Sequence, residues 1–392
     1  MIERNLKKML LERLDYYPAV ALLGPRQIGK TTLVKQLIPD IKRPVMYLDL
    51  ELPSDYKKLE NPEFFFEHHK DYCIIIDEIQ RALHLLPILR AIIDSYRVFS
   101  KFILLGSASP TLLRKSSETL TGRISYMELS GIHLTEISNR LHVTKHWVRG
   151  GFPTPLLAKD NKRATYWFQD FLRTFIENDI PMLGLNSSPQ KLSRFVSMIA
   201  GSQGSLFNAS TYAKSLGVSI PTVQKYKEFL EQAYLLRSLQ PFFINVKKRL
   251  VKSPKVYIRD SGVLHHLLGV SELHHLLGHI SAGNSWEGYV IESIASYLQN
   301  QIQLVPYFYR TQDGAECDLV LVQGNTPTIS IEIKINDNPS VKRGFLHSID
   351  DLGTKNNFIV VPNCKKKFLI KENIFVCDLG DMLKFLNGMI FD

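Results

Sequence analysis

The stretch AVALLGPRQIGKTTLVKQLI, residues 19–38, decides the fold class. It begins with five apolar residues, 19–23, which predict a short strand. A glycine-containing turn follows, and in residues 30–38 apolar side chains recur at the spacing of a helix. A strand, a tight turn and a helix in this order predict the first unit of an α/β sheet.

The turn matches the pattern G-x-x-x-x-G-K-[ST] through Gly24, Gly29, Lys30 and Thr31. In this pattern main-chain N–H groups hold phosphates, the lysine meets the β- and γ-phosphate oxygens, and the hydroxyl binds Mg²⁺. The flanking strand and helix disfavour the alternative, a glycine-rich turn with an incidental lysine. We therefore expect ATP and Mg²⁺ as cofactors. The expected nucleotide-binding residues are Gly24, Pro25, Arg26, Gln27, Ile28, Gly29, Lys30, Thr31 and Thr32.

Residues 71–80, DYCIIIDEIQ, supply the acids that such a site requires. The apolar strand 73–76 is typical of a parallel sheet covered on both faces, and Asp77 and Glu78 follow it directly. We expect Asp77 to hold Mg²⁺, directly or through water, and Glu78 to orient and polarise the attacking water. This pair favours hydrolysis over binding alone. The alternative is a strand that ends in a solvated acidic turn.

Two further apolar segments, 44–51 and 101–109, predict strands in the same α/β rhythm. Ligands of open α/β sheets gather at the carboxyl ends of the strands. We therefore expect Ser107, at the end of the second segment, to contact the γ-phosphate and to belong to the nucleotide site. A simple helix N-cap by Ser109 or Thr111 competes for the hydroxyl role.

Residues 120–129, LTGRISYMEL, place Arg123 just before a further predicted strand. An arginine near a γ-phosphate stabilises the charge of the transition state. Arg123 is therefore a candidate catalytic residue together with Lys30 and Glu78. It could serve its own site or that of a neighbouring subunit, and the second arrangement requires a homo-oligomer.

Five motifs together resemble one protein family: GPRQIGKTT, IIIDEIQ, LLGSAS, LTGR and then GGFPTP at 150–155. They look like the AAA-type P-loop ATPases whose C-terminal half is the restriction-endonuclease-like domain of unknown function 4143. The resemblance covers essentially the whole chain. It implies a parallel sheet with helices on both faces, places Arg26 in the loop signature, and makes Arg123 the candidate arginine finger.

The composition, 45% hydrophobic and 22% charged, is that of a globular protein. Residues 1–17 lack the apolar core of a signal peptide, and no segment approaches 18 consecutive apolar residues, so we expect a cytoplasmic protein without membrane contact. The four cysteines show no CxxC spacing, which argues against a zinc site or a disulfide framework. The net charge of +10 favours a polyanionic partner, and DNA is the expected one.

A chain of 392 residues is too long for one ordinary core. We expect three domains. Residues 1–145 would form the P-loop ATPase domain, 146–265 a helical connector with a winged-helix-like part, and 266–392 a nuclease-like α/β domain.

The middle of the chain predicts helices. Residues 162–200 read as two helices that form a connector. A helix at 209–216, a break at Gly217 and a second amphipathic helix with Ser219 as cap and Pro221 in its first turn follow. This is the spacing of a helix-turn-helix.

The next segment, 242–260, is β-prone with a basic tip and resembles the wing of a winged-helix module. The basic residues of this predicted wing are Lys247, Lys248, Arg249, Lys252 and Lys255. The second helix has a mixed face rather than a strongly basic one, formed by Gln224, Lys225, Lys227 and Glu228. Contact with DNA phosphates and groove edges, or docking to a protein, are both open.

In the last third, GAECDLVLVQGNTPTISIEIK at 314–334 predicts an antiparallel hairpin centred on Asn325. Paired position numbers then sum to 650, which places Asp318 opposite Glu332 and Glu316 opposite Lys334. The other face is expected to hold Cys317, Leu319, Leu321, Ile329, Ile331, Ile333 and Ile335.

Two directly opposed carboxylates repel each other unless a cation lies between them. We expect Asp318 and Glu332 to bind Mg²⁺, with Lys334 on the same face to orient a hydroxide or steady a phosphate. This is the D…E-x-K constellation of restriction-endonuclease-like folds. Glu287 is the expected third acid, chosen over Glu292 because its WEG setting resembles the helix-start acid of that family. The alternative is a solvent-facing polar edge with a Glu316–Lys334 ion pair.

The sequence as a whole predicts an α/β protein that hydrolyses ATP, acts on or around DNA, and carries a nuclease-like C-terminal domain. The alternative is a nucleotide-dependent regulatory or interaction protein whose C-terminal domain binds without cleaving.

Overall fold

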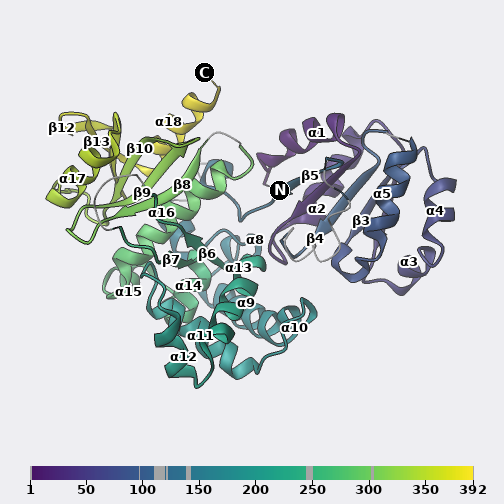
Figure 1. The fold of residues 1–392 in the computed structure, drawn as a ribbon, viewed down its shortest axis with the longest axis horizontal. Helices are drawn as coiled ribbons and strands as arrows, with labels where there is room; N and C mark the ends of the chain where they lie inside the picture. The colour runs from purple at the N-terminus through teal and green to yellow at the C-terminus, as the bar shows by residue number, and fades with distance from the viewer. Residues whose placement is uncertain are drawn as a thin grey trace. The chain divides into compact units, whose positions relative to one another are not determined.

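The computed structural model describes residues 2–96, 98–109, 120, 122–137, 143–243, 250–301 and 304–391 (Figure 1). The chain divides into two compact units. The first unit comprises Met1–Ile132, Met182–Leu185 and Gln232–Tyr234, and the second comprises His133–Pro181, Asn186–Glu231 and Leu235–Asp392. The three-domain division stays a prediction.

The first unit is built on a five-stranded, all-parallel sheet with the strand order β2-β3-β4-β1-β5. The strands are β1 (Ala19–Leu23), β2 (Val45–Asp49), β3 (Cys73–Asp77), β4 (Phe102–Gly106) and β5 (Ile124–Glu128). Every residue of β1, β3 and β4 is buried, as expected for central strands that helices cover on both faces. The predicted parallel α/β fold is therefore confirmed.

The helices of the first unit alternate with these strands along the chain. They are α1 (Leu6–Tyr16), α2 (Lys30–Leu37), η1 (Ile38–Asp40), α3 (Pro53–Lys58), α4 (Pro62–His68), η2 (Ile79–Ala82) and α5 (Leu85–Tyr96). On one face of the sheet, Leu86, Leu89 and Ile93 of α5 pack in one core with Ile74 and Ile76 of β3. This core fixes the carboxyl ends of the strands, where the predicted site lies.

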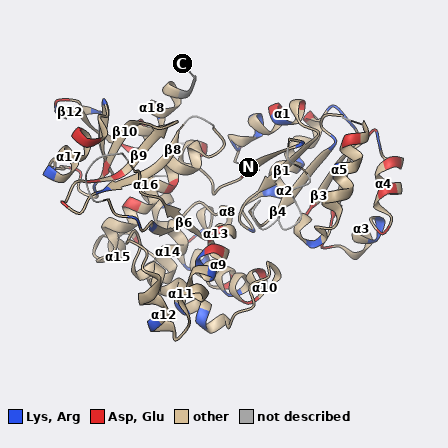
Figure 2. Cartoon of the chain, in the orientation of Figure 1, with Lys and Arg blue, Asp and Glu red and all other residues tan. Residues whose placement is uncertain are grey.

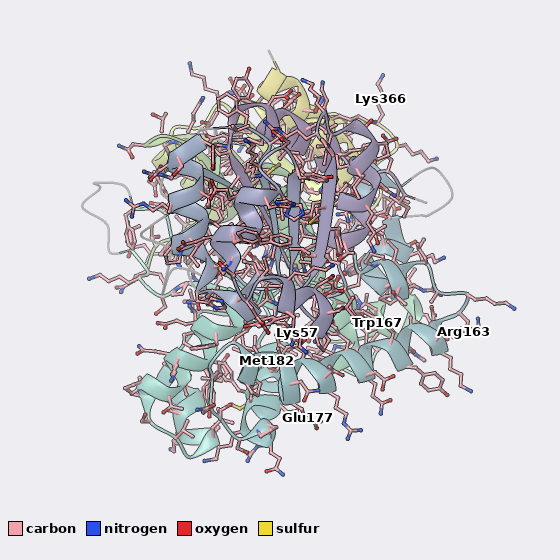
Figure 3. All side chains as sticks on the ribbon, turned by 90° about the vertical axis from the view of Figure 1, so that its right-hand side faces the viewer. Lys57, Arg163, Trp167, Glu177, Met182 and Lys366 are labelled. Carbon is pink, nitrogen blue, oxygen red and sulfur yellow. The ribbon has the colours of Figure 1, made fainter. Side chains whose placement is uncertain are left out.

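The second unit begins with helices. They are η3 (Leu134–Glu136), α7 (Val143–Arg149), α8 (Pro153–Leu156), α9 (Asn161–Thr174), the π-helix η4 (Phe175–Asp179), α10 (Ile180–Met182), α11 (Pro189–Gly201), α12 (Ala209–Leu216), α13 (Ile220–Gln232), α14 (Ser261–Leu267) and α15 (Leu273–Leu277). Trp167 of α9, labelled in Figure 3, stacks on Phe171 with ring centroids 4.9 Å apart. Phe152 lies 5.0 Å from the Trp167 ring, so aromatic packing joins α8 to α9.

The predicted helix at 209–216 and its break are confirmed. Asn208 caps α12, accepting hydrogen bonds from the N–H groups of Ser210 and Thr211, and Gly217 ends it in the left-handed region at φ 62°. Ser219 accepts from the N–H of Thr222 at 3.3 Å in the first turn of α13. The short strands β6 (Leu236–Leu239) and β7 (Lys255–Ile258) then pair antiparallel.

The predicted basic wing is wrong in one residue. Lys255 begins β7 and is only 4% exposed, because β7 is buried along its whole length. Lys252 is exposed, as predicted. Residues 247–249 of the predicted wing lie outside the described residues.

The C-terminal part is a six-stranded mixed sheet with the order β12-β13-β11-β10-β9-β8. Its strands are β8 (Val305–Arg310), β9 (Glu316–Gln323), β10 (Thr326–Ile333), β11 (Asn356–Val361), β12 (Phe368–Lys371) and β13 (Ile374–Asp378), and its helices are α16 (Ala282–Leu298), α17 (Arg343–Leu352) and α18 (Leu379–Phe391). Strands β10, β11 and β13 run parallel, and the remaining pairs are antiparallel.

The register of the β9–β10 hairpin agrees with the prediction where the core sits. Ile329 pairs with Leu321 and Ile331 with Leu319, so the position numbers sum to 650. Nearer the turn Thr326 pairs with Gln323, because the register shifts after Pro327. This register brings the acidic ends of β9 and β10 together.

One face assignment on β9 is wrong. Cys317 packs with Val320 and Val322, not with Leu319, whose cluster lies on the other side of the sheet. The reason is a β-bulge: Tyr307 pairs with Val320 and Tyr309 with Cys317, so two β9 residues, Asp318 and Leu319, face the single residue between them on β8.

No described helix is long and apolar enough to cross a membrane. Acidic and basic positions are interspersed among the elements, as Figure 2 shows for α3 and α4 of the first unit. Helix α3 carries Lys57 and Lys58, and α4 carries Glu63 and Glu67.

Candidate nucleotide site and a second acidic site

The glycine-rich turn depends on backbone angles that favour glycine. Gly24 has φ 153°, and a Cβ there would lie 2.3 Å from the carbonyl oxygen of Leu129. Gly29 has φ 99° and is the N-cap of α2, so the first N–H groups of that helix face the turn. The carbonyl of Ile28 accepts from the guanidinium of Arg4 at 3.3 Å. Arg4 thus helps to fix the turn through the Ile28 carbonyl.

Lys30 lies at the centre of the turn and is 5% exposed. Its Nζ donates to the carbonyl oxygens of Gly24 at 3.0 Å and Pro25 at 2.9 Å, and to Oγ of Ser107 at 3.1 Å. These three partners are neutral oxygens, and the ammonium charge also acts on the Glu78 carboxylate, where it opposes the rise of the Glu78 pKa. An ammonium at this position suits the binding of phosphate oxygens.

Asp77 ends β3 and is 4% exposed. Its Oδ2 accepts from Oγ1 of Thr31 at 2.7 Å and from the hydroxyl of Tyr47. Burial and the Asp77 carboxylate raise the pKa of Tyr47 well above its ordinary value, so Tyr47 remains a neutral donor. A hydroxyl and a carboxylate oxygen side by side are the ligands that Mg²⁺ prefers.

Glu78 adopts a left-handed conformation, φ 59°, which turns it out of the line of β3. Its carboxylate accepts from the amide of Gln80 and, at 3.4 Å, from Oγ of Ser107. The Gln80 carbonyl oxygen in turn accepts from the N–H of Ser107 at 3.4 Å. Burial raises the pKa of Glu78 above its ordinary value, with Lys30 opposing the shift, and a raised carboxylate pKa suits a general base.

The structure therefore brings together five of the predicted residues at the carboxyl edge of the sheet: Lys30, Thr31, Asp77, Glu78 and Ser107. Three further groups there were not predicted. They are Tyr47, Gln80 and Glu51, which pairs with Arg26 at 3.1 Å and with Arg81 at 3.0 Å. Only Gln80 carried a sequence signal, because it closes the stretch DYCIIIDEIQ.

Arg123 does not lie at this edge within its own chain. It immediately precedes β5, whose first residue pairs with Ala19 and whose last residue pairs with Leu23, next to the turn. Its guanidinium contacts Asp94, with Nη2 and Oδ2 3.0 Å apart. Five strand residues, about 16 Å, separate it from the glycine-rich turn.

The second acidic site lies at the acidic end of the β9–β10 hairpin. Lys255 Nζ lies 3.1 Å from Glu287, 3.5 Å from Glu316 and 3.8 Å from Asp318. The hydroxyl of Tyr257 donates to the same Glu287 oxygen at 2.6 Å. Burial alone would lower the pKa of Lys255, but the three carboxylates outweigh it and raise that pKa above its ordinary value.

The other predicted residues of this site also have protein partners. Oδ2 of Asp318 accepts from the N–H of Ile333 at 2.8 Å, and Glu332 forms an ion pair with Lys334. Burial, together with the charges of Glu287 and Glu332, raises the pKa of Asp318 well above its ordinary value, while Lys255 opposes the shift. The alternative with a Glu316–Lys334 ion pair is not what the structure shows, since Glu316 contacts Lys255 and, at 3.5 Å, Arg310, and Lys334 contacts Glu332.

The helix acid nearest to Asp318 is Glu287 rather than Glu292. Glu292 lies further along α16, is partly buried, and pairs with Arg237 and with Arg259, the latter at 2.8 Å. These two arginines hold the pKa of Glu292 below its ordinary value despite its burial. Glu292 therefore serves packing, whereas Glu287 reaches the acidic end of the hairpin.

Family models of known proteins match three successive parts of the chain. Residues 16–138 match the family described as AAA domain, 140–274 match a domain of unknown function (DUF8612), and 282–382 match another (DUF4143). An uncharacterized protein of Mycobacterium tuberculosis is 36% identical over 385 residues, which cover 98% of this chain and 85% of that protein. The chain belongs to this family of AAA-domain proteins with a C-terminal DUF4143.

Two other comparisons concern more distant proteins. An uncharacterized protein of Haemophilus influenzae is 23% identical over 300 residues, which cover 69% of this family member and 74% of that protein. Among solved structures, the Walker-type ATPase of Pyrococcus abyssi has a TM-score of 0.45 and 16% identity, with 68% of this chain and 96% of that chain covered. At this identity the likeness is one of fold alone.

The DUF4143 part of this family member does not fit a divalent cation as predicted. Within the described residues, the only group of three side chains whose ligand atoms lie within 4.8 Å of one another is Glu272, His274 and His275, which are exposed and distant in sequence from the hairpin. The hairpin carboxylates instead have ammonium partners. The nucleotide site does fit Mg²⁺, through Thr31 and Asp77.

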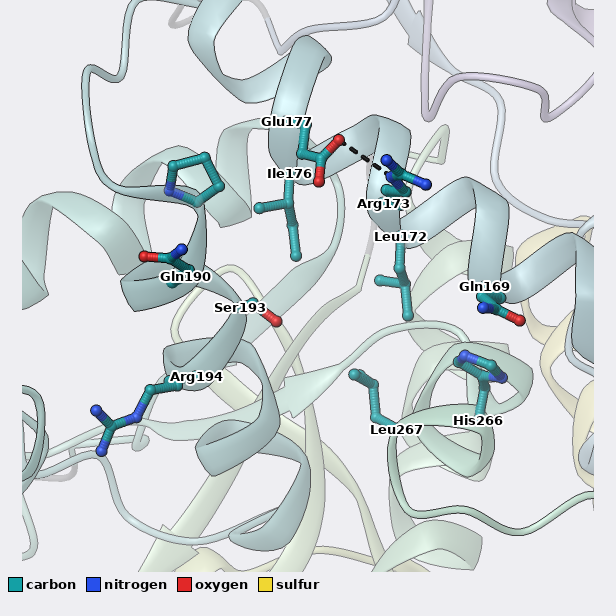
Figure 4. A pocket seen from close by; sticks show the side chains of 11 residues that line it. Gln169, Leu172, Arg173, Ile176, Glu177, Gln190, Ser193, Arg194, His266 and Leu267 are labelled. Carbon is teal, nitrogen blue, oxygen red and sulfur yellow. Dashed lines mark hydrogen bonds and ion pairs between the residues drawn. The ribbon is translucent and has the colours of Figure 1, made fainter.

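A separate pocket of about 610 Å³ opens in the helical part of the second unit. Figure 4 shows Arg173 and Glu177 paired along the α9–η4 stretch that lines it, at 3.2 Å, with Arg194 and His266 also lining it. None of the predicted site residues lies there.

Proposed function

We propose that this family member binds and hydrolyses ATP with Mg²⁺ at the glycine-rich turn. The observation that carries the proposal is the convergence of Lys30, Thr31, Asp77, Glu78 and Ser107 on one edge of a parallel sheet. These groups are a cation, a hydroxyl, two carboxylates and a second hydroxyl. In P-loop enzymes, a lysine, a hydroxyl and carboxylates of this kind bind the phosphates and Mg²⁺ and position the attacking water.

Each residue has one role in the proposed reaction. Main-chain N–H groups of the turn and the ammonium of Lys30 bind the phosphates, and the oxygens of Thr31 and Asp77 hold the metal. Mg²⁺, when bound, neutralises charge on the β- and γ-phosphates. Glu78 accepts a proton from the attacking water. Ser107 contacts both Lys30 and Glu78, so its hydroxyl can link the γ-phosphate to the general base by hydrogen bonds.

Calorimetry and turnover together test the proposal. Wild-type protein and Glu78→Gln should both bind ATP with Mg²⁺, whereas Glu78→Gln should lose turnover by about 100- to 10,000-fold, because general base catalysis contributes that much. Lys30→Ala should lose binding itself. Glu60→Gln, which changes an exposed acid of the same unit, should match wild type. If wild type takes up no ATP, or if Glu78→Gln hydrolyses it normally, the assignment fails.

Arg123 is proposed to act on the site of a neighbouring chain, because it lies at the other end of β5 from its own turn. This role requires a homo-oligomer. Mixing Glu78→Gln chains with Arg123→Ala chains should restore turnover that neither variant has alone. Two inactive variants that stay inactive when mixed would contradict this role.

We further propose that the protein acts on or around DNA through a winged-helix-like middle region. Its support is the net charge of +10, the helix-turn-helix arrangement of α12 and α13, and the exposed Lys214 and Lys225. Duplex DNA should stimulate ATP turnover, and binding should weaken steeply as salt rises. A Lys214→Ala/Lys225→Ala variant should lose this stimulation, whereas Lys191→Ala on α11 should keep it.

A second candidate function is a nucleotide-dependent interaction protein whose nuclease-like C-terminal part binds without cutting. The contact of Lys255 with three carboxylates favours it. Incubation with single- and double-stranded DNA or RNA, with Mg²⁺ or Mn²⁺, separates the two. Cleavage that Asp318→Ala or Lys334→Ala abolishes would support a nuclease, and no cleavage in any condition would support binding alone.

A further inference from the structure

The acidic end of the hairpin already contains a cation of the protein's own. The ammonium of Lys255 lies within 3.8 Å of Glu287, Glu316 and Asp318, and the side chain is 6% exposed. A Mg²⁺ ion would need the same carboxylate oxygens at about 2.0–2.1 Å. The metal and the ammonium therefore compete for one position.

The main chain of Lys255 is fixed on both sides. It pairs with Leu239 of β6 and forms a bridge with Leu206, while its ammonium also lies 5.6 Å from the centre of the Phe308 ring. The N–H of the next residue, Val256, donates to the carbonyl of Ser205 at 3.2 Å. These contacts hold the lysine in place as part of the β6–β7 pair.

The remaining charges of the site are also balanced within the protein. Glu332 pairs with Lys334, and Glu316 has Arg310 as a second partner at 3.5 Å. The cations Lys255, Lys334 and Arg310 thus contact the carboxylates of the site, which are Glu287, Glu316, Asp318 and Glu332, and the charge of Lys342 also acts on Glu332.

We infer that Lys255 takes the place of the divalent metal at the acidic end of the hairpin, so that the DUF4143 part of this protein is a metal-free site. The inference rests on the proposed nuclease-like interpretation of that part. It does not depend on ATP hydrolysis.

A Mn²⁺ titration of the full chain without nucleotide tests the inference. Wild type and Asp318→Asn should bind the same number of ions, because the hairpin contributes no metal site. Lys255→Met should gain one additional Mn²⁺, and Lys255→Met/Asp318→Asn should lose it again. Ions bound at the glycine-rich turn or at Glu272, His274 and His275 are common to all variants and cancel in the comparison.

Two matched variants control for the change of charge. Lys255→Arg keeps a cation and should gain no Mn²⁺, and Lys252→Met removes an exposed lysine of the same segment and should behave as wild type. Circular dichroism checks that each variant is folded. Should Lys255→Met fail to fold, the number of Mn²⁺ ions bound by wild type and by Asp318→Asn tests the inference by itself.

Two results would overturn the inference. One is a Mn²⁺ ion bound by wild type and lost in Asp318→Asn, and the other is a folded Lys255→Met that gains no ion. Either result leaves the ATPase proposal intact, since no nucleotide is present. Conversely, a failure to hydrolyse ATP leaves the Mn²⁺ result unaffected.

Discussion

The two acidic sites of this protein differ in what their carboxylates contact. At the glycine-rich turn, Asp77 accepts from the hydroxyls of Thr31 and Tyr47, which are neutral donors. At the hairpin, Glu287 and Asp318 lie beside the ammonium of Lys255. Neutral donors fix the direction of a carboxylate but leave its charge, whereas an ammonium cancels the charge. Only the first arrangement leaves a carboxylate ready for a metal.

Removing the lysine should have the largest effect on stability. Lys255→Met leaves Glu287 and its neighbours without their cation, which should lower the free energy of unfolding by about 3–5 kcal/mol. Lys255→Met/Glu287→Gln should recover part of this loss. All three tryptophans, Trp147, Trp167 and Trp286, belong to the second unit, so urea unfolding followed by tryptophan fluorescence reports on that unit.

The exposed Lys252 provides the control for the unfolding measurements on Lys255→Met. Lys252→Met should change the free energy of unfolding by less than about 0.5 kcal/mol, as is usual for a surface position. If Lys255→Met also changed the free energy of unfolding by less than about 0.5 kcal/mol, the Lys255 ammonium would not be balancing buried charge. The two acidic sites would then not differ in how their carboxylates are balanced.

The next largest effect should be on ATP turnover, through Asp77 at the glycine-rich turn. Asp77→Asn keeps the shape of the side chain but removes the charge, so Mg²⁺-dependent ATP turnover should fall by about 100-fold or more. Glu332→Gln makes the same kind of change at the hairpin and should leave turnover within about twofold of wild type. Steady-state phosphate release at saturating Mg²⁺ measures both. Equal losses in the two variants would mean that the sites are not independent.

The sequence predicted the first site because its residues lie within short contiguous motifs. Lys30 and Thr31 begin the helix after β1, and Asp77 and Glu78 end the next buried strand, so a parallel sheet brings them to one edge. Tyr47 could not be predicted in this way. It sits inside the half-buried strand β2, where an aromatic residue is ordinary, and its role follows only from the pairing of β2 with β3.

The second site was predicted only in part. Alternation along the hairpin gave the correct register around Ile331, but it could not reveal the bulge at Asp318 that moves Cys317 to the other face. Lys255 follows a basic run, and it was therefore read as part of an exposed wing. Its burial depends on Glu287 and Glu316, 32 and 61 residues further along the chain, and such long-range contacts leave no local pattern.

A pH series should sharpen the contrast through Asp318. Its pKa is raised in the folded protein, so the native state retains a proton that the unfolded chain releases. The resulting stabilisation is complete below about pH 4, the ordinary value for aspartate, and is lost as the pH rises toward the folded pKa. Asp318→Asn has no such proton. Its stability relative to wild type should therefore increase with pH, by up to about 1.4 kcal/mol per unit.

Tryptophan-monitored urea unfolding at pH 5, 6, 7 and 8 measures this difference between wild type and Asp318→Asn. Asparagine can still accept the hydrogen bond from the N–H of Ile333. A pH-dependent difference in stability between the two proteins therefore comes from the titration of Asp318. A difference that stays constant across the series would show that Asp318 is ionised throughout, in which case the charge balance at the hairpin would have to be different.

The smallest effect is expected from two tyrosines, one in each site, whose hydroxyls each donate to a carboxylate. Tyr47→Phe removes a donor that orients Asp77, which should cost about 1 kcal/mol and raise the Mg²⁺ concentration for half-maximal ATP turnover roughly fivefold. Tyr257→Phe removes the donor to Glu287 and should leave that concentration unchanged. A Mg²⁺ titration of turnover measures both variants. If Tyr257→Phe shifted the Mg²⁺ dependence as much as Tyr47→Phe, the hairpin would be exchanging metal, and a neutral donor rather than Lys255 would control its carboxylates.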